Sequence, residues 1–102
     1  MLTEKELKIK VGVLKRSKKD VGFYEKEKTK QLEKIASMRS DAKYDDHDIR
    51  KQQEVLAETE AMLPESYQRL EAIAQEIEML LEQVPEGTEW ACIAEANELL
   101  HA

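Results

Sequence analysis

The chain has 102 residues, of which 37% are charged and 5% are aromatic, and its formal net charge is −6. This length predicts one domain, and this composition is typical of long helices rather than of a β-sandwich or an α/β fold. Cys92 is the single cysteine, which excludes an internal disulfide and favours a reducing compartment. No apolar run approaches eighteen residues, so we expect a cytosolic protein with no membrane partner.

The net charge conceals an asymmetry between the two parts of the chain. Residues 1–44 hold 13 Lys and Arg against 7 Asp and Glu, whereas residues 45–102 hold 3 against 15. A basic first helix folded back against an acidic second helix would be attracted to it. A basic stretch also suits nucleic acid, but the acidic total disfavours that interpretation, and we expect no nucleic-acid partner.

A first helix is predicted over about residues 4–40. Thr3 and Glu6 have the spacing of a capping box at its start. Ser17 interrupts its apolar stripe, and Gly12 and Gly22 each weaken it by about 1 kcal/mol relative to Ala. Such a helix gains its stability from packing. The stripe consists of Leu7, Val11, Leu14, Val21, Tyr24, Leu32, Ile35 and Met38.

Residues 41–47 are polar and predict a connection between two helices. Asp45 or Asp46 can cap the helix that follows, because carboxylates are favourable at a helix N-terminus. An Asp cluster beside His47 also suggests metal binding. The stretch lacks the Gly and the final Glu of a calcium loop, so we expect no metal.

A second long helix is predicted over about residues 46–83. Every seventh residue of this segment is apolar, and such a repeat indicates a helix packed along another helix. Pro64 removes one backbone hydrogen bond, and a helix restarting there would have Leu63 as a poor cap. We therefore expect one helix kinked at Pro64. The seven-residue repeat comprises Ile49, Leu56, Leu63, Leu70, Ile77 and Val84.

The segment 84–87 contains Pro and Gly and predicts a break, after which Thr88 is a candidate N-cap for a third helix over about residues 89–101. The predicted fold is all-α: an elongated three-helix bundle in a single domain over residues 1–102. It has two long antiparallel helices, the second kinked at Pro64, and a shorter third. Because the third helix covers only part of the hairpin, we expect exposed apolar surface that suits a partner.

The sequence shows no pattern typical of an enzyme. The chain has two His and one Cys, and its three Gly are isolated rather than gathered in a phosphate-binding loop. We expect no catalytic residues. Two functions remain open: a helical-bundle or coiled-coil adaptor, and a small independent bundle that grips a client protein.

Four stretches then point to one family: residues 9–16 (IKVGVLKR), 24–27 (YEKE), 48–56 (DIRKQQEVL) and 62–72 (MLPESYQRLEA). Their order and spacing resemble the tubulin-folding cofactor A family (tubulin-specific chaperone A) over about residues 5–83. The resemblance implies a three-helix bundle that captures quasi-native β-tubulin after chaperonin release and passes it toward the αβ-tubulin heterodimer. It implies no nucleotide, metal or other cofactor, a cytoplasmic, cytoskeleton-associated location, and other tubulin-folding cofactors as further candidate partners. Monomer and homodimer both stay open.

With this resemblance, we expect a partner-binding surface on the first two helices. An intramolecular interpretation stands beside it: the two tyrosines can pack between the long helices, and the basic residues can pair with the acidic second helix. Surface ion pairs contribute about 0–1 kcal/mol each, so charge would affect orientation and rate more than affinity. The candidate residues are Lys15, Arg16, Tyr24, Glu25, Lys26, Glu27, Asp48, Lys51, Pro64 and Tyr67.

Overall fold

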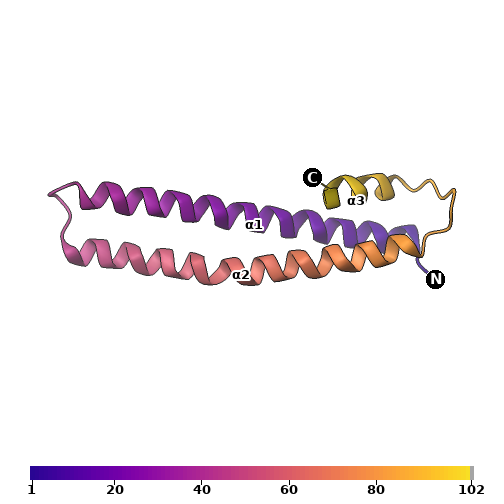
Figure 1. Cartoon of the computed structure of the whole chain (residues 1–102), viewed down its shortest axis with the longest axis horizontal. Coiled ribbons are helices and arrows are strands. Elements are labelled where there is room, and N and C mark those ends of the chain that lie inside the picture. The colour runs from indigo at the N-terminus through magenta and orange to yellow at the C-terminus, as the bar shows by residue number, and fades with distance from the viewer. Residues whose placement is uncertain (102) are drawn as a thin grey trace. The chain divides into compact units, whose positions relative to one another are not determined.

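The computed structural model describes residues 1–101, which form three helices: α1 (Glu4–Arg39), α2 (Asp46–Glu82) and α3 (Ala91–His101) (Figure 1). No strand occurs among these residues. The predicted all-α fold, with two long helices and a short third, is confirmed. None of the helices in this described part combines the length and apolar character needed to cross a bilayer.

Side-chain caps explain where the two long helices begin. The Thr3 hydroxyl oxygen accepts a hydrogen bond from the Glu6 amide at 3.2 Å. At the second helix, the Asp48 amide donates to the Asp45 carboxylate at 2.9 Å, and the Asp45 amide donates to the Asp48 carboxylate at 3.2 Å. The Asp48 amide lowers the pKa of Asp45, because it stabilises the ionised form. Asp45 is therefore the cap, and Asp46 is the first helical residue.

The prediction that Thr88 caps the third helix is wrong. The Thr88 hydroxyl donates to the Pro85 carbonyl at 2.7 Å, and its amide donates to the same oxygen at 3.2 Å. Gly87 has a φ of 87°, a left-handed conformation that glycine adopts without steric cost. Residues 85–88 thus form a β-turn with glycine in its third position. Thr88 closes this turn, and α3 begins later, at Ala91.

Two compact units divide the chain. Unit 1 consists of Met1–Lys19 together with the chain from Gln68 onward, and unit 2 consists of Asp20–Tyr67. The first part of α1 and the second part of α2 belong to unit 1, as does α3. The remainder of each long helix belongs to unit 2, with the connection that joins them. The expected single domain stays a prediction.

Unit 1 contains an apolar core to which all three helices contribute. In this unit α3 lies beside α1 (Figure 1). A Lys15–Glu95 ion pair joins the two helices, and the Lys18 ammonium donates to the Leu99 carbonyl at 2.6 Å. The residue numbers rise together along both helices, so α3 runs parallel to α1. The buried core comprises Leu7, Val11, Leu14, Ile73, Ile77, Cys92 and Ala96.

Unit 2 is a pair of antiparallel helices without a third. Tyr67 of α2 hydrogen-bonds Glu25 of α1, and the Lys28 ammonium lies 4.0 Å from the Glu60 carboxylate. The residue numbers rise along α1, from 25 to 28, while those of their partners on α2 fall, from 67 to 60, so the two helices are antiparallel. The line along which the two helices face each other, here called the seam, buries the apolar residues Val21, Ile35 and Met38 of α1 and the polar residues Thr59 and Ser66 of α2.

The predicted apolar stripe of α1 fails at one position. Leu32 is 48% exposed, and the half-buried residue beside it is Gln31. A stripe with a seven-residue period places residues 24, 31 and 38 in the seam, so residue 32 lies on its flank. Six of the eight predicted stripe residues are buried, and Tyr24 is half-buried.

Pro64 lies inside α2, which continues through it from Asp46 to Glu82. Proline removes one amide donor from the ladder of a helix and crowds the carbonyl four residues before it. The side chain of Pro64 is exposed, so the Glu60 carbonyl that loses its donor is on the solvent side of the helix. A chain divided into separate helices at this residue is excluded, and the bend we expect there stays a prediction.

The seam of unit 2 contains a hydroxyl that finds no partner. Ser66 is 2% exposed, and its Oγ makes no hydrogen bond within residues 1–101. Burying such a group has a desolvation cost of about 1–3 kcal/mol. We expect Ser66→Ala to raise the free energy of unfolding by about 1 kcal/mol, which corresponds to a melting temperature higher by about 4–8 °C.

Urea and thermal unfolding followed by circular dichroism measure this change. The matched control is Ser37→Ala on α1, where the side chain is exposed and only the small difference in helix propensity applies. A Ser66→Ala protein that is less stable than the parent would show that the hydroxyl contributes favourably to the seam.

Candidate partner-binding surface

The ten residues expected to bind a partner fall in both units. Lys15 and Arg16 lie on α1 in unit 1. The other eight lie in unit 2, and the helix pair brings some of them together. These eight are Tyr24, Glu25, Lys26 and Glu27 on α1, and Asp48, Lys51, Pro64 and Tyr67 on α2.

Lys15 and Arg16 differ in their surroundings although they are neighbours. Lys15 pairs with Glu95 of α3, so part of its role is to hold that helix. Arg16 is exposed and has no ion-pair partner within the part of the chain that the structure describes. The expected pairing with the acidic second helix is made in this unit by another residue, Lys10, whose ammonium lies 2.8 Å from Glu76. Arg16 is thus the available cation of the two.

Tyr24 and Tyr67 meet the seam of unit 2 in different ways. Tyr24 is half-buried, and its ring lies edge-on to Phe23 with the centroids 5.4 Å apart. Tyr67 is 47% exposed, and its hydroxyl donates to the Glu25 carboxylate on α1. This hydrogen bond and the negative charge of Glu25 raise the pKa of Tyr67. Tyr24 is therefore partly covered and contacts its neighbour on α1, while Tyr67 links the two helices at the rim.

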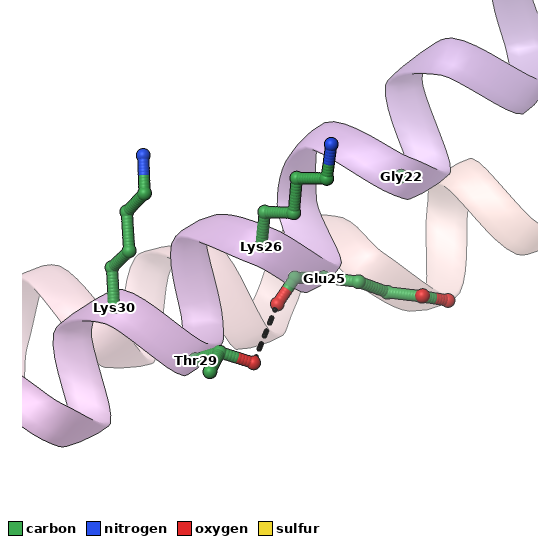
Figure 2. Close-up of a pocket in the computed structure, with 5 residues that line it drawn as sticks. All are labelled: Gly22, Glu25, Lys26, Thr29 and Lys30. Atoms are coloured by element: carbon green, nitrogen blue, oxygen red, sulfur yellow. Dashed lines mark hydrogen bonds between the residues drawn. The ribbon is translucent and has the colours of Figure 1, made fainter.

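Lys26 borders an open depression on α1 (Figure 2). The depression has no side chain at Gly22, where an added Cβ would meet nothing within 4 Å. Figure 2 shows the side chains of Lys26 and Lys30 extending from the same side of the helix, while the Thr29 hydroxyl donates to the Glu25 carbonyl at 3.1 Å. Lys26 has no ion-pair partner within residues 1–101.

The remaining four candidate residues of unit 2 have different surroundings. They are Glu27, Asp48, Lys51 and Pro64. The Glu27 carboxylate lies 3.9 Å from the Lys30 ammonium. Asp48 is engaged by Asp45 at the start of α2, so its observed role is structural. Lys51 and Pro64 are both exposed on α2. Within residues 1–101, no hydrogen bond or ion pair joins these four residues to the Tyr67–Glu25 pair.

Sequence reasoning missed two cations that share a second depression in unit 2. Arg39 of α1 and Arg50 of α2 line it, together with Asp46, Ile49 and Gln53. Neither arginine has a carboxylate within ion-pairing distance among the described residues. The heptad spacing contains the signal, because Arg39 follows the seam residue Ile35 by four and Arg50 follows Ile49 by one.

The side chains of the described residues offer little for metal or nucleophilic chemistry. No group of three His, Cys, Asp or Glu side chains within residues 1–101 is arranged to hold a metal ion. Cys92 is buried in the core of unit 1, and burial raises the pKa of its thiol, which disfavours the reactive thiolate. What this surface presents is exposed apolar and cationic side chains on helices.

Comparison with known proteins matches residues 2–100 to the family described as tubulin binding cofactor A. The chain belongs to the tubulin binding cofactor A family. A relative in this cofactor A family, tubulin-specific chaperone A of Gallus gallus, is 40% identical over 98 residues, covering 96% of this chain and 90% of the relative.

Solved structures agree with membership of the cofactor A family. Tubulin folding cofactor A from Arabidopsis thaliana has a TM-score of 0.85 at 30% identity, with 96% of this chain and 92% of that chain covered. A structure described as Rbl2p, a β-tubulin binding post-chaperonin cofactor, has a TM-score of 0.72 at 34% identity, covering 95% and 99% of the two chains.

The Tyr67–Glu25 hydrogen bond can be tested by titration. The bond needs a protonated phenol, so the raised pKa of Tyr67 means that its stabilising effect is present below the ordinary tyrosine pKa. The effect is lost as the pH rises through the raised value. We expect Glu25→Gln to bring the pKa of Tyr67 down toward its ordinary value, because it removes the neighbouring charge.

Ultraviolet difference absorbance measures the phenolate, and Tyr67→Phe identifies the signal of this residue among the three tyrosines. Glu27→Gln is the control, because that carboxylate pairs with Lys30 and not with the phenol. Equal titration of Tyr67 in the parent and in Glu25→Gln would contradict the bond.

Proposed function

We propose that this chain captures β-tubulin after its release from the cytosolic chaperonin and passes it toward the αβ-tubulin heterodimer. The observation that carries the proposal is the likeness to Rbl2p, which is described as a β-tubulin binding post-chaperonin cofactor. That likeness covers 95% of this chain at 34% identity, so it includes both long helices and α3. The proposal places the chain in the cytosol, where the chaperonin acts, in association with the cytoskeleton that the client builds.

The proposed mechanism is binding by helical surfaces, without catalysis and without a cofactor. A client that is not yet in its heterodimer exposes apolar surface, which a holding protein must cover reversibly. Leu32 and Tyr67 of unit 2 are about half exposed and supply apolar area. Charged residues around them keep the free protein soluble and give orientation to the encounter. The quasi-native state of the client is part of the proposal.

The test is a binding experiment with β-tubulin released from chaperonin reactions. We expect the purified chain to retain β-tubulin on size-exclusion chromatography, in a complex whose mass by analytical ultracentrifugation gives the stoichiometry. The same measurement on the free protein decides between monomer and homodimer. A cooperatively folded chain that retains no β-tubulin would contradict the function and favour the adaptor. Retention of other tubulin-folding cofactors is tested in the same way.

Charge reversal at Arg16 tests whether cations of unit 1 steer the encounter. Arg16→Glu is cleaner than reversal at Lys15, because Lys15 also pairs with Glu95 of α3. We expect association with β-tubulin to slow by about three-fold at low salt, with the difference shrinking as salt is added. Stopped-flow fluorescence measures the rates.

The control for Arg16 is Lys5→Glu, which makes the same change in net charge at another exposed position of α1. Equal association rates for the parent and Arg16→Glu at low salt, with both proteins folded, would remove Arg16 from the surface.

A further inference from the structure

Unit 1 shows how a third helix packs onto the α1–α2 pair. It meets α1 at Lys15 and Lys18, which follow the buried Leu14 by one and four residues. In the seven-residue repeat these are the positions on one flank of the seam. The corresponding residues in unit 2, one and four after the buried Val21, are Gly22 and Glu25. Unit 2 contains α1 and α2 segments alone, so it has no third helix of its own to cover this flank.

We call this flank of unit 2 the open face. Two observations place residues of both helices on it. The Tyr67 hydroxyl donates to Glu25 across the seam, and Arg39 and Arg50 line one depression. The depression that Lys26 borders lies at Gly22 (Figure 2). The open face consists of Gly22, Lys26, Leu32 and Arg39 of α1 and Arg50 and Tyr67 of α2.

The open face is apolar at its centre. Leu32 is 48% exposed and Tyr67 is 47% exposed, although both are large side chains on well-formed helices. Gly22 adds bare backbone, over which an added Cβ would have open space. A helix laid along this flank would bury Leu32 and Tyr67 as α3 buries the apolar flank of unit 1.

The open face carries three cations that have no ion-pair partner. The Glu25 carboxylate accepts the hydrogen bond of the neutral Tyr67 hydroxyl and keeps its charge, whereas the Glu60 carboxylate lies 4.0 Å from the Lys28 ammonium. Lys26, Arg39 and Arg50 have no ion pair in the described part of the chain. Asp46 lines the depression of the two arginines without pairing with either. These three cations therefore offer sites for carboxylates of a partner, although the whole chain carries −6.

We propose that the open face binds one amphipathic helix of the client, with an apolar stripe against Leu32 and Tyr67 and carboxylates beside the cations. The inference rests on the proposed function, because it names where and how that client binds. From Lys26 to Arg39 the helix rises by about 20 Å, so the bound helix has about three to four turns. For comparison, α3 is 11 residues long, and it presents Glu95 to Lys15 in unit 1.

Equilibrium binding to β-tubulin released from chaperonin tests the proposal. We expect the double variant Lys26→Glu, Leu32→Ala to raise the dissociation constant by about ten-fold or more, since it reverses one cation and removes apolar area. The matched control is Lys34→Glu, Phe23→Ala, which makes the same two kinds of change on exposed residues of α1. Phe23 follows Val21 by two residues and Lys34 follows Lys28 by six, which places both off the open face. We expect the control to bind within about two-fold of the parent.

Two further measurements keep the outcomes distinct. Circular dichroism melting confirms that each variant is folded. A benzoylphenylalanine in place of Thr29, within the Gly22 depression, should cross-link β-tubulin through one acidic helical segment, whereas the same group in place of Ser37 should not. Mass spectrometry identifies the cross-linked segment.

Failure of the inference differs from failure of the proposed function. If the parent binds β-tubulin and the open-face variant binds equally well, or if cross-links spread over unrelated segments, the open face is wrong while the function holds. If the folded parent does not bind β-tubulin, both proposals are overturned.

Discussion

The structure depends on how much apolar surface two helices can bury without a third. Two paired helices bury one narrow stripe each, and a wider core needs a further element over the flank of the pair. In unit 1, α3 supplies it, and Cys92 and Ala96 join the core residues of α1 and α2. Unit 2 has no such element, and its seam contains buried Thr59 and Ser66 beside its few apolar residues. The two units therefore differ in the source of their stability.

The polar seam of unit 2 connects its packing with its proposed use. Thr59 satisfies its hydroxyl by donating to the Val55 carbonyl at 3.3 Å, whereas Ser66 Oγ and Gln31 Oε1 are buried without a hydrogen-bond partner in the described chain. Buried polar groups lower stability, and in paired helices they can select one register over others. Regions with few buried apolar contacts open more readily than a core does. Such a region suits a surface that binds a client and later releases it.

Much of the fold could be predicted because its signals are local. The Thr3–Glu6 spacing placed the start of the first long helix, and the neighbouring Asp45 and Asp46 placed the start of the second to within one residue. The seven-residue repeat carried α2 through Pro64. Thr88 failed because turn chemistry in the segment 85–88 competed with capping. The surface was harder to predict, because the Lys15–Glu95 pair and the shared depression of Arg39 and Arg50 join residues distant in sequence. The spacing of residues along one helix does not predict which residues of another helix they contact.

The burial of Cys92 has a practical consequence. Cys92 lies on α3, belongs to the core of unit 1 and is 5% exposed, and it is the single cysteine of the chain. An alkylating reagent can reach the sulfur only while this short helix is detached from unit 1, so the reaction rate counts detachment events. The alkylation rate of Cys92, measured by mass spectrometry, therefore reports how often α3 detaches, without any engineered label. Comparing this rate with and without a bound client shows whether a client bound to unit 2 changes the detachment of α3 in unit 1.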